Sequence, residues 1–434
     1  MSPEVVGVIG LVGLLALLSA GVPIAVAMGL CGITGMCALT SPEAALVKSG
    51  VAAFHSISNY ELGVLPLFVL MAHICFASGA TQKFFDAAAK LIGHRPGGLA
   101  LASIAGCAGF GAISGSSLAT AATVGLVALP EMRKRQYSPA LATGVLAAGG
   151  TLGVLIPPSG ALIVFGIIAE QSIGKLFVAA LLPGISQALF YMLAILVLCH
   201  FRPGLAPASA RASWGDRWRA LYGLFDISAL ALFVLAGFLF GWFTPTEAAS
   251  VGAVGAFVLC AARGKLTLAN LREALKQTLR TTGMIYAVLL GAHIYSTFLS
   301  VTRIPERVAQ FVVDLQAGPL VAVCAMAVVL LILGSFLDGL APMLLATPVF
   351  LPIATNLGLS PIWFGIFLVR AMEIGFVHPP VGMNVYVIHG LAPDIPLTSI
   401  FRGILPFLGM DFLHLALLIA APKLTLWLPS LMGN

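Results

Sequence analysis

Charged residues are scarce in this sequence. Lys, Arg, Asp and Glu make up 9% of the 434 residues, whereas apolar residues make up 60%. Soluble proteins carry roughly 25% charged residues. The composition therefore excludes a soluble globular protein and predicts a chain that lies in a lipid bilayer, with room for roughly ten helices of about 20 residues each.

The sequence also lacks the patterns of several other protein classes. Its seven cysteines are scattered through apolar runs without a Cys-x-x-Cys pair, which predicts free buried thiols and neither a metal site nor disulfides. The net charge of +6 is small for this length and indicates no nucleic-acid partner. There is no Walker A lysine and no His-Glu-x-x-His motif. No Lys or Arg precedes the first apolar run, so we expect that run to remain as a helix.

The main feature of the sequence is a set of ten apolar runs, each long enough to cross a membrane. Two further stretches, 97–131 and 317–355, are interrupted by Gly, Ser, Asp and Pro and are predicted to be re-entrant hairpins of two half-helices. Charged segments between the runs are expected to be interfacial helices or loops, namely 81–95, 202–221 and 265–280. The ten predicted spans are 5–21, 22–40, 62–79, 138–170, 174–201, 223–242, 244–263, 282–300, 360–392 and 397–421.

The distribution of basic residues gives an orientation to these spans. If the cluster 133–135 faces the cytoplasm, alternation places sixteen of the 22 Lys and Arg residues on that side and five on the other, with Arg370 inside a span. Cytoplasmic loops carry an excess of Lys and Arg. This bias supports hairpins that do not cross and predicts that both termini lie outside, in the periplasm.

An internal repeat relates the two parts of the chain. The order Leu-Ala, Val-x-Leu-Pro, Ser-Pro, Gly and Pro-Pro between residues 118 and 158 recurs between 340 and 380 at a constant offset of 222 residues. We therefore predict two homologous halves, 1–217 and 218–434, each with five spans and one hairpin. Because the number of spans per half is odd, the second half must be inserted upside down, as an inverted-topology repeat.

The interruptions predict where the binding site lies. The first hairpin tip, 111–120, combines Gly with Ser and Thr, and the next span breaks at 153–159. Glycine permits unwinding, and hydroxyls can cap amides or offer oxygen to a cation, although small residues also serve tight helix packing. The second half repeats this pattern at 334–342 and 375–384. Broken helices at corresponding places of an inverted repeat point to a binding site near the bilayer midplane.

Ionisable residues inside the spans are further candidates. Asp338 lies at the second hairpin tip, where an intramembrane carboxylate costs roughly 2.5–3.5 kcal/mol, so it is either functional or a helix N-cap. Arg370 and Glu373 lie three residues apart on one helical face and are expected to pair with each other, as a structural tie or in the substrate path. His378 could offer a carbonyl or an imidazole, or be a satisfied core residue. Glu247 begins a helix, where capping is the simpler role.

Several of these runs together resemble the signature of a known family. They resemble the large membrane subunit of tripartite ATP-independent periplasmic (TRAP) transporters, the DctM-like family, over nearly the whole chain. The similar runs are 111–123, 129–132, 150–153, 156–159, 244–249, 336–338, 373–375 and 379–384. The resemblance implies an all-α polytopic membrane protein with the elevator-type fold of the ion-transporter superfamily.

The same resemblance implies a function and partners. The chain would take up a small organic anion, such as a C4-dicarboxylate or a sugar acid, coupled to sodium ions and with no other cofactor. A periplasmic binding protein would deliver the anion, and a small four-helix membrane subunit would complete the complex in the bacterial inner membrane. A stand-alone anion symporter of the same superfamily is the alternative.

The motifs that resemble the family also imply which residues bind sodium and which line the substrate path. The resemblance implies one sodium site formed, mostly through backbone carbonyls, by Ser114, Gly153, Ile156 and Pro158. It implies a second sodium site formed by Gly334, Gly375, His378 and Val381. Position 378 departs from the Thr expected there, and Gly at position 111 offers no hydroxyl ligand. We expect the substrate path to include Ser116, Ser117, Thr120, Asp338, Arg370, Glu373 and Asn384.

An enzymatic role is disfavoured. A membrane-embedded enzyme using Asp338 and His378 as acid and base would require the two groups to converge on a water-accessible cavity. The repeat places them on separate elements and explains the breaks without chemistry. The sequence therefore predicts a transporter and not an enzyme.

Overall fold

Helices make up all the regular structure that is described for this chain. The computed structural model describes residues 2–58, 60–208, 211–314, 318–337 and 339–432, and these ranges contain helices and no strand. Within them, six helices are long and apolar enough to cross a membrane, or up to eight if each of two bent pairs is one span. The all-α polytopic fold predicted from the sequence is confirmed.

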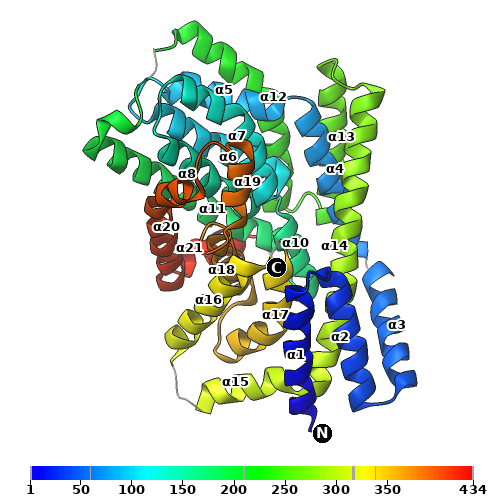
Figure 1. Cartoon of the computed structure of the whole chain (residues 1–434). Helices are drawn as coiled ribbons and strands as arrows, with labels where there is room; N and C mark the ends of the chain where they lie inside the picture. Colours follow the sequence, from blue (N-terminus) through cyan, green and yellow to red (C-terminus); the bar gives the residue numbers. More distant parts are fainter. Residues whose placement is uncertain (1, 59, 209–210, 315–317, 338, 433–434) are drawn as a thin grey trace.

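One group of helices packs around the longest helix, α14 (Leu268–Thr302). This helix has 35 residues and runs along one side of the molecule, where α2, α3 and α4 pack against it and α13 packs on α4 (Figure 1). We call these helices the α14 group. Its other members are α1 (Pro3–Ser19), α2 (Ile24–Leu39), α3 (Pro42–Ser58), η1 (Tyr60–Gly63), α4 (Val64–Ala77), α12 (Trp214–Leu239) and α13 (Pro245–Ala262).

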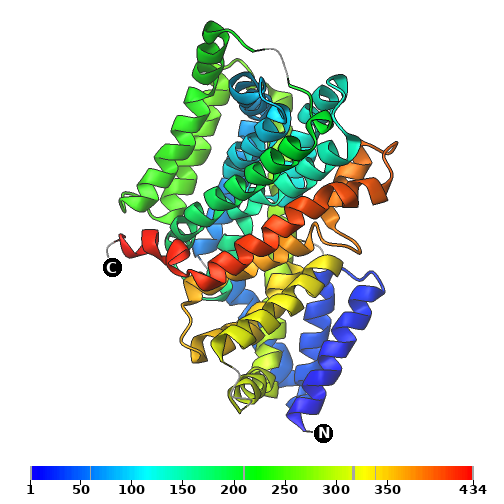
Figure 2. The ribbon, with the colours of Figure 1, turned by 90° about the vertical axis from the view of Figure 1, so that its left-hand side faces the viewer.

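A second group contains both predicted hairpins, and we call it the hairpin group. Figure 2 shows α20 crossing the middle of the molecule diagonally, and α20 packs along α8. The backbones approach closely there, since a Cβ on Gly403 would lie 1.8 Å from the carbonyl oxygen of Ala140. The members are α6 (Gly98–Ser114), α7 (Ser117–Lys134), α8 (Pro139–Gly150), α9 (Leu152–Leu155), α10 (Gly160–Ile168), α11 (Ile173–Phe201), η2 (Pro203–Leu205), α16 (Pro319–Phe336), α17 (Ala341–Asn356), α18 (Pro361–Gly375), α19 (Met383–Leu391), α20 (Leu397–Ala420) and α21 (Lys423–Ser430).

Two short amphipathic helices connect the groups. The helix α5 (Ala80–Ile92) leads from α4 into the first hairpin, and α15 (Ile304–Asp314) leads from α14 into the second. They lie at opposite ends of the molecule, each near the hairpin that it precedes (Figure 1). The segment 81–95, expected to be an interfacial helix or a loop, is therefore mostly the helix α5.

Parts of the two other charged segments are continuous with long helices and do not form separate interfacial helices or loops. Most of 265–280 is the first part of α14, and 214–221 is the first part of α12. Local caps explain this, because the hydroxyls of Ser213 and Thr267 accept hydrogen bonds from Asp216 N and Asn270 N, both at 3.1 Å. The sequence analysis also missed α3, which begins at Pro42 after the capping residue Ser41.

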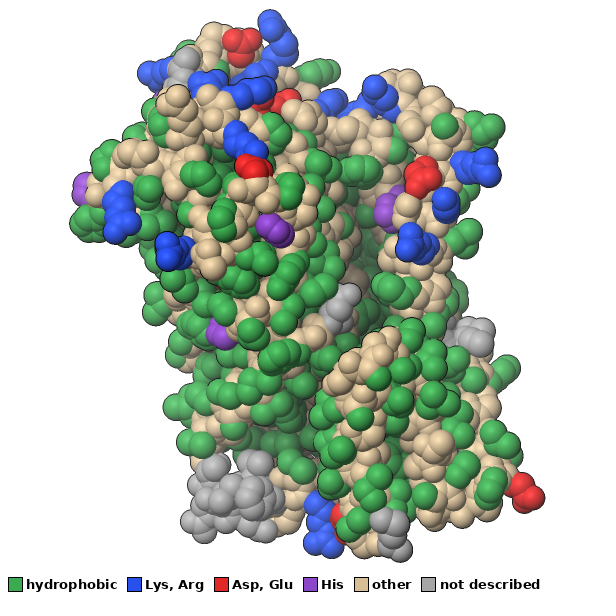
Figure 3. All heavy atoms as spheres, viewed as in Figure 1, with side chains coloured by type: hydrophobic (Ala, Val, Ile, Leu, Met, Phe, Trp, Pro, Cys, Tyr) green, Lys and Arg blue, Asp and Glu red, His purple; other side chains and the backbone are tan. Residues whose placement is uncertain are grey.

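The surface agrees with a bilayer as solvent. On the face shown in Figure 3, Lys and Arg side chains gather at the end that holds α5 and the start of α12, and apolar side chains dominate the middle. Large apolar side chains are exposed on α1, α12 and α13, among them Val12, Phe225 and Val254. Water would not favour so much exposed apolar surface, whereas lipid would.

Candidate ion and substrate site

The first hairpin tip is a sharp reversal made by small residues. The helix α6 ends at Ser114, and Gly115 follows at a φ of 60°, a left-handed conformation that favours glycine. Ser116 then caps α7 by accepting a hydrogen bond from Ala119 N at 3.4 Å. The hydroxyls of Ser114 and Thr120 lie 2.7 Å apart and tie the two half-helices together.

This tip packs directly on the break in the following span. The helices α8–α9 and α10 meet at a bend of 43°. A Cβ on Gly153 would lie 2.3 Å from Thr120 Oγ1 and 2.6 Å from the Ser116 carbonyl oxygen, and a Cβ on Gly115 would lie 2.7 Å from the Pro158 carbonyl oxygen. Three members of the first predicted sodium set, Ser114, Gly153 and Pro158, are therefore brought together.

Ile156, the fourth member, lies just beyond the end of α9. Its backbone N–H still bonds to the Leu152 carbonyl at 3.0 Å, while its backbone has turned to an extended conformation. Its side chain packs toward α11, since a Cβ on Gly184 would lie 2.8 Å from Ile156 Cγ1. The chain between α9 and α10 is thus unwound next to the tip.

The second hairpin meets the second break through two glycines. A Cβ on Gly375 would lie 2.6 Å from the carbonyl carbon of Gly334, and a Cβ on Gly334 would lie 2.8 Å from the Met372 carbonyl oxygen. These two members of the second predicted sodium set therefore touch. His378 and Val381 lie in the segment that joins α18 to α19, and His378 N donates to the Ile374 carbonyl at 3.0 Å.

Asp338 was predicted at this second tip and lies outside the described residues. The imidazole Nδ1 of His378 has no hydrogen-bond partner among the described residues. The ring packs against Phe412 with centroids 6.5 Å apart.

The expected pairing of Arg370 with Glu373 is wrong. The Arg370 guanidinium instead forms an ion pair with Asp411 on α20, and both side chains are at most 1% exposed. Neither oxygen of Glu373 has a hydrogen-bond partner among the described residues. The expectation considered neighbours on one helix, whereas the Arg370 side chain reaches across to another helix that holds a buried carboxylate.

Asp411 anchors a buried network that the sequence analysis did not assign to the site. Its Oδ1 also accepts hydrogen bonds from the Tyr191 hydroxyl at 2.6 Å and from Gln187 Nε2 at 2.8 Å. The Tyr191 hydroxyl lies 2.9 Å from Thr151 Oγ1, at the end of α8. The network therefore joins the break in α8–α10 to α18. A signal was present, since a carboxylate within a span needs a cation, and Arg370 is the one Lys or Arg residue that the count by side left inside a span.

Asn384 links the second break to the first hairpin. Its Nδ2 donates to Ser117 Oγ at 2.9 Å and to the Ala147 carbonyl oxygen at 3.1 Å. The Ser117 hydroxyl also lies within interaction range of Glu373. Of the expected substrate path, Ser116, Ser117, Thr120, Glu373 and Asn384 therefore lie in one region, while Arg370 is directed to Asp411.

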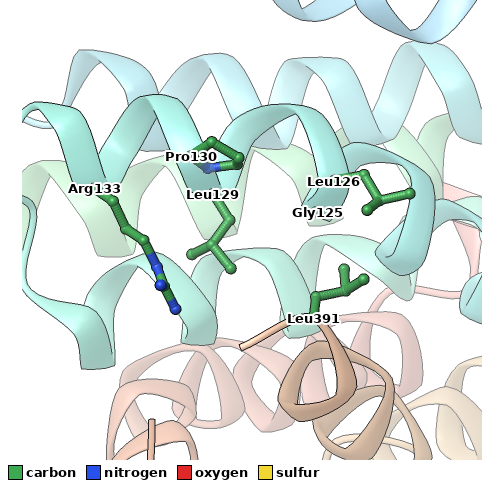
Figure 4. Close-up of a pocket in the computed structure, with 6 residues that line it drawn as sticks. All are labelled: Gly125, Leu126, Leu129, Pro130, Arg133 and Leu391. Carbon is green, nitrogen blue, oxygen red and sulfur yellow. The ribbon is translucent and has the colours of Figure 1, made fainter. Parts of the chain in front are cut away.

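A separate hollow of about 210 Å³ lies between α7 and α19 (Figure 4). It is lined by Gly125, Leu126, Leu129, Pro130, Arg133 and Leu391. Arg133 pairs with Asp394 at 2.8 Å, where both side chains are exposed. The lining residues on α7 begin eight positions after Ser117, about 12 Å along the helix. The hollow is therefore not part of the polar region at the tip.

The family model described as the tripartite ATP-independent periplasmic transporter, DctM component, matches residues 11–424. This chain belongs to that family. It is therefore the large membrane subunit of a TRAP transporter, as the sequence motifs indicated, and not an enzyme.

Individual relatives agree with this assignment. The chain is 35% identical over 399 residues to the C4-dicarboxylate TRAP transporter large permease protein DctM of Pseudomonas aeruginosa, covering 91% of this chain and 92% of that protein. It is 33% identical to the sialic acid TRAP transporter large permease protein SiaM of Vibrio cholerae, covering 86% and 87%. The crystal structure of the Alcanivorax borkumensis YdaH transporter matches with a TM-score of 0.60 at 16% identity, covering 87% of this chain and 89% of that one, which indicates a shared fold.

Proposed function

We propose that this TRAP subunit moves a small organic anion into the cell together with sodium ions. The observation that carries the proposal is the packing of each hairpin tip on the break of the next span, through Gly111 and Gly153 in one half and Gly334 and Gly375 in the other. Unwound segments expose backbone carbonyls that coordinate cations, and half-helix N-termini face anions. Two such places fit two coupling sites around one substrate.

The sodium ions would bind where the motifs indicate. The first site would use Ser114, Gly153, Ile156 and Pro158, which surround the unwound segment under the first tip. The second would use Gly334, Gly375, His378 and Val381 under the second tip. Backbone oxygen suits a hard cation such as sodium, and His378 can take part through its carbonyl as a Thr would.

The substrate class rests on the relatives. C4-dicarboxylates and sialic acid, named for two of them, are both organic acids. We propose a C4-dicarboxylate or a sugar acid for this chain, received from a periplasmic binding protein. A small four-helix membrane subunit would cover part of the exposed apolar surface of the α14 group.

The arrangement of the two groups supports an elevator movement and the inverted repeat. The hairpin group would carry the site across the bilayer while the α14 group stays fixed, with α5 and α15 as the connections that absorb the displacement. These connections and their hairpins lie at opposite ends of the molecule, as an inverted repeat requires (Figure 1). The basic end would face the cytoplasm of the bacterial inner membrane, with both termini periplasmic.

Uptake into proteoliposomes tests this function. Vesicles would hold this chain with its small subunit, and a panel of labelled carboxylates would be added with and without binding protein and with and without an inward sodium gradient. We expect accumulation only when both additions are present. Accumulation that needs no binding protein, and that persists in vesicles holding this chain without the small subunit, would favour a stand-alone symporter. Accumulation that ignores sodium would contradict the coupling.

A further inference from the structure

We propose that Glu373 and Asn384, with Ser117, form an additional sodium site, separate from the two sites under the hairpin tips. The proposal rests on the sodium-coupled function above and adds to it a residue set and a number of ions. Ser117 begins α7 in the first half, while Glu373 and Asn384 flank the second break. The site therefore joins the two halves.

Unbalanced charge is the first observation. Within the described part of the hairpin group, the fully buried charged side chains are Arg370, Glu373 and Asp411. With both carboxylates ionised, one guanidinium would leave one negative charge uncompensated, and the guanidinium is already paired with Asp411. A buried charge is strongly unfavourable unless it is paired or coordinates a metal ion. A monovalent cation next to Glu373 would balance the cluster.

Unpaired oxygens are the second observation. Both carboxylate oxygens of Glu373 and Oδ1 of Asn384 are buried and form no hydrogen bond of normal geometry among the described residues, and the Ser117 hydroxyl lies within interaction range of Glu373. The orientation of the Asn384 amide is fixed, because the Ala147 carbonyl can only accept, so Nδ2 must face it and Oδ1 must face away. Buried acceptors that outnumber the donors beside them suit a cation and disfavour an anion.

The repeat gives an internal comparison. Glu373 occupies the position 222 residues after Thr151. The Thr151 hydroxyl lies 2.7 Å from the Ala148 carbonyl oxygen and 2.9 Å from the Tyr191 hydroxyl, so the first half needs no ion there. The carboxylate at 373 forms no hydrogen bond of normal geometry among the described residues, although the Ser117 hydroxyl lies within interaction range of it. Hydrogen bonds within the first half therefore account for the polar side chain at position 151. No comparable set of bonds within the described ranges accounts for the carboxylate at position 373.

Charge repulsion also argues against direct contact between Glu373 and the substrate. A carboxylate-bearing substrate would be repelled by an unpaired carboxylate, whereas a sodium ion bound between Glu373, Asn384 Oδ1 and Ser117 Oγ would remove that repulsion. Glu373 would then act on the substrate through the ion. Occupation of this site would favour entry of the anion, which is a form of coupling.

Sodium binding by the purified complex tests the proposal. Bound ²²Na⁺ would be measured at saturation on this chain with its small subunit, for wild type, Glu373→Gln, Glu373→Asp and the control Thr278→Val. Thr278 is a buried hydroxyl of the α14 group that bonds only within its own helix, at 2.7 Å to the Ala274 carbonyl. We expect Glu373→Gln to bind one sodium ion fewer than wild type, and the control to bind the same number.

Glu373→Asp keeps the charge on a shorter side chain, so it should bind the full number with lower affinity. A full number of ions in Glu373→Gln, with the complex still folded, would overturn the proposal, as would an unchanged affinity in Glu373→Asp. Absence of saturable sodium binding in wild type would instead overturn the sodium-coupled function itself. The two failures are therefore distinguishable.

Discussion

The two broken helices of the hairpin group use the same backbone device with different side chains. In both, a glycine in the span lies against the hairpin tip, Gly153 in the first half and Gly375 in the second. Around the first break the polar groups are neutral hydroxyls, whereas the second follows Arg370 and Glu373, which are fully buried. The repeat thus preserves the geometry of the breaks, while charge is concentrated in one half.

The Asp411 network shows how the charged half depends on the neutral one. Asp411 forms an ion pair with Arg370 of its own half and accepts hydrogen bonds from Tyr191 and Gln187 of the first half. Three donors on one oxygen make a buried carboxylate tolerable. Variants that break this network or the glycine contacts should therefore differ in how strongly they destabilise the protein or reduce transport.

Removing Asp411 should have the largest effect. Asp411→Leu leaves the Arg370 guanidinium buried without its partner, and breaking a buried ion pair in this way destabilises proteins by about 3–5 kcal/mol. We expect a large fall in the thermal unfolding midpoint of the detergent-solubilised complex. The double variant Arg370→Met with Asp411→Leu should recover much of that loss. Equal stability of Asp411→Leu and wild type would show that the pair is not formed.

Tyr191→Phe should have the next largest effect on stability. It removes one hydrogen bond to a buried carboxylate, which is worth about 1.5–3 kcal/mol. Because Arg370 and Gln187 still contact Asp411, the loss should be smaller than in Asp411→Leu, as measured by the same thermal unfolding. Phe407, which packs edge-on against the Tyr191 ring at 5.8 Å, should hold the phenyl ring in place. A loss as large as that of Asp411→Leu would contradict this ranking.

The glycine contacts should respond equally in the two halves. Gly153→Ala and Gly375→Ala each place a Cβ within 2.6 Å of backbone atoms of the facing hairpin, and such overpacking costs about 1–3 kcal/mol. We expect both variants to reduce uptake strongly. Gly390→Ala is the matched control, since a Cβ there meets nothing within 4 Å. If one variant transports as well as this control, the two contacts are not equivalent.

Thr151→Val should have the smallest effect. Valine keeps the shape of the side chain and removes the contact with the Tyr191 hydroxyl, which retains Asp411 as its acceptor. The expected loss is about 0.5–1.5 kcal/mol in an unfolding measurement. Thr143→Val is the comparison, because the Thr143 hydroxyl bonds within its own helix, to the Pro139 and Ala140 carbonyls. A much larger loss at position 151 would mean that the network transmits more stability across the halves than its geometry indicates.

The sequence predicted the features that depend on local residue types. Gly115 and the Pro157-Pro158 and Pro379-Pro380 pairs are local signals, so the first tip and both breaks lie where expected. The ion pair of Arg370 could not be predicted from spacing, because its partner Asp411 lies 41 residues away on another helix. Because Arg370 pairs with Asp411, Glu373 is left without an ion-pair partner among the described residues. Residue spacing could not predict this either.

The most direct test of the account is the initial rate of uptake as a function of external sodium concentration. Membrane potential and pH difference would be clamped at zero, and a labelled C4-dicarboxylate and sialic acid would be supplied with binding protein and small subunit. We predict, for at least one of these organic acids, a rate that rises with a sigmoidal sodium dependence and is lost when potassium replaces sodium. Transport at equal rates in sodium and potassium would contradict it.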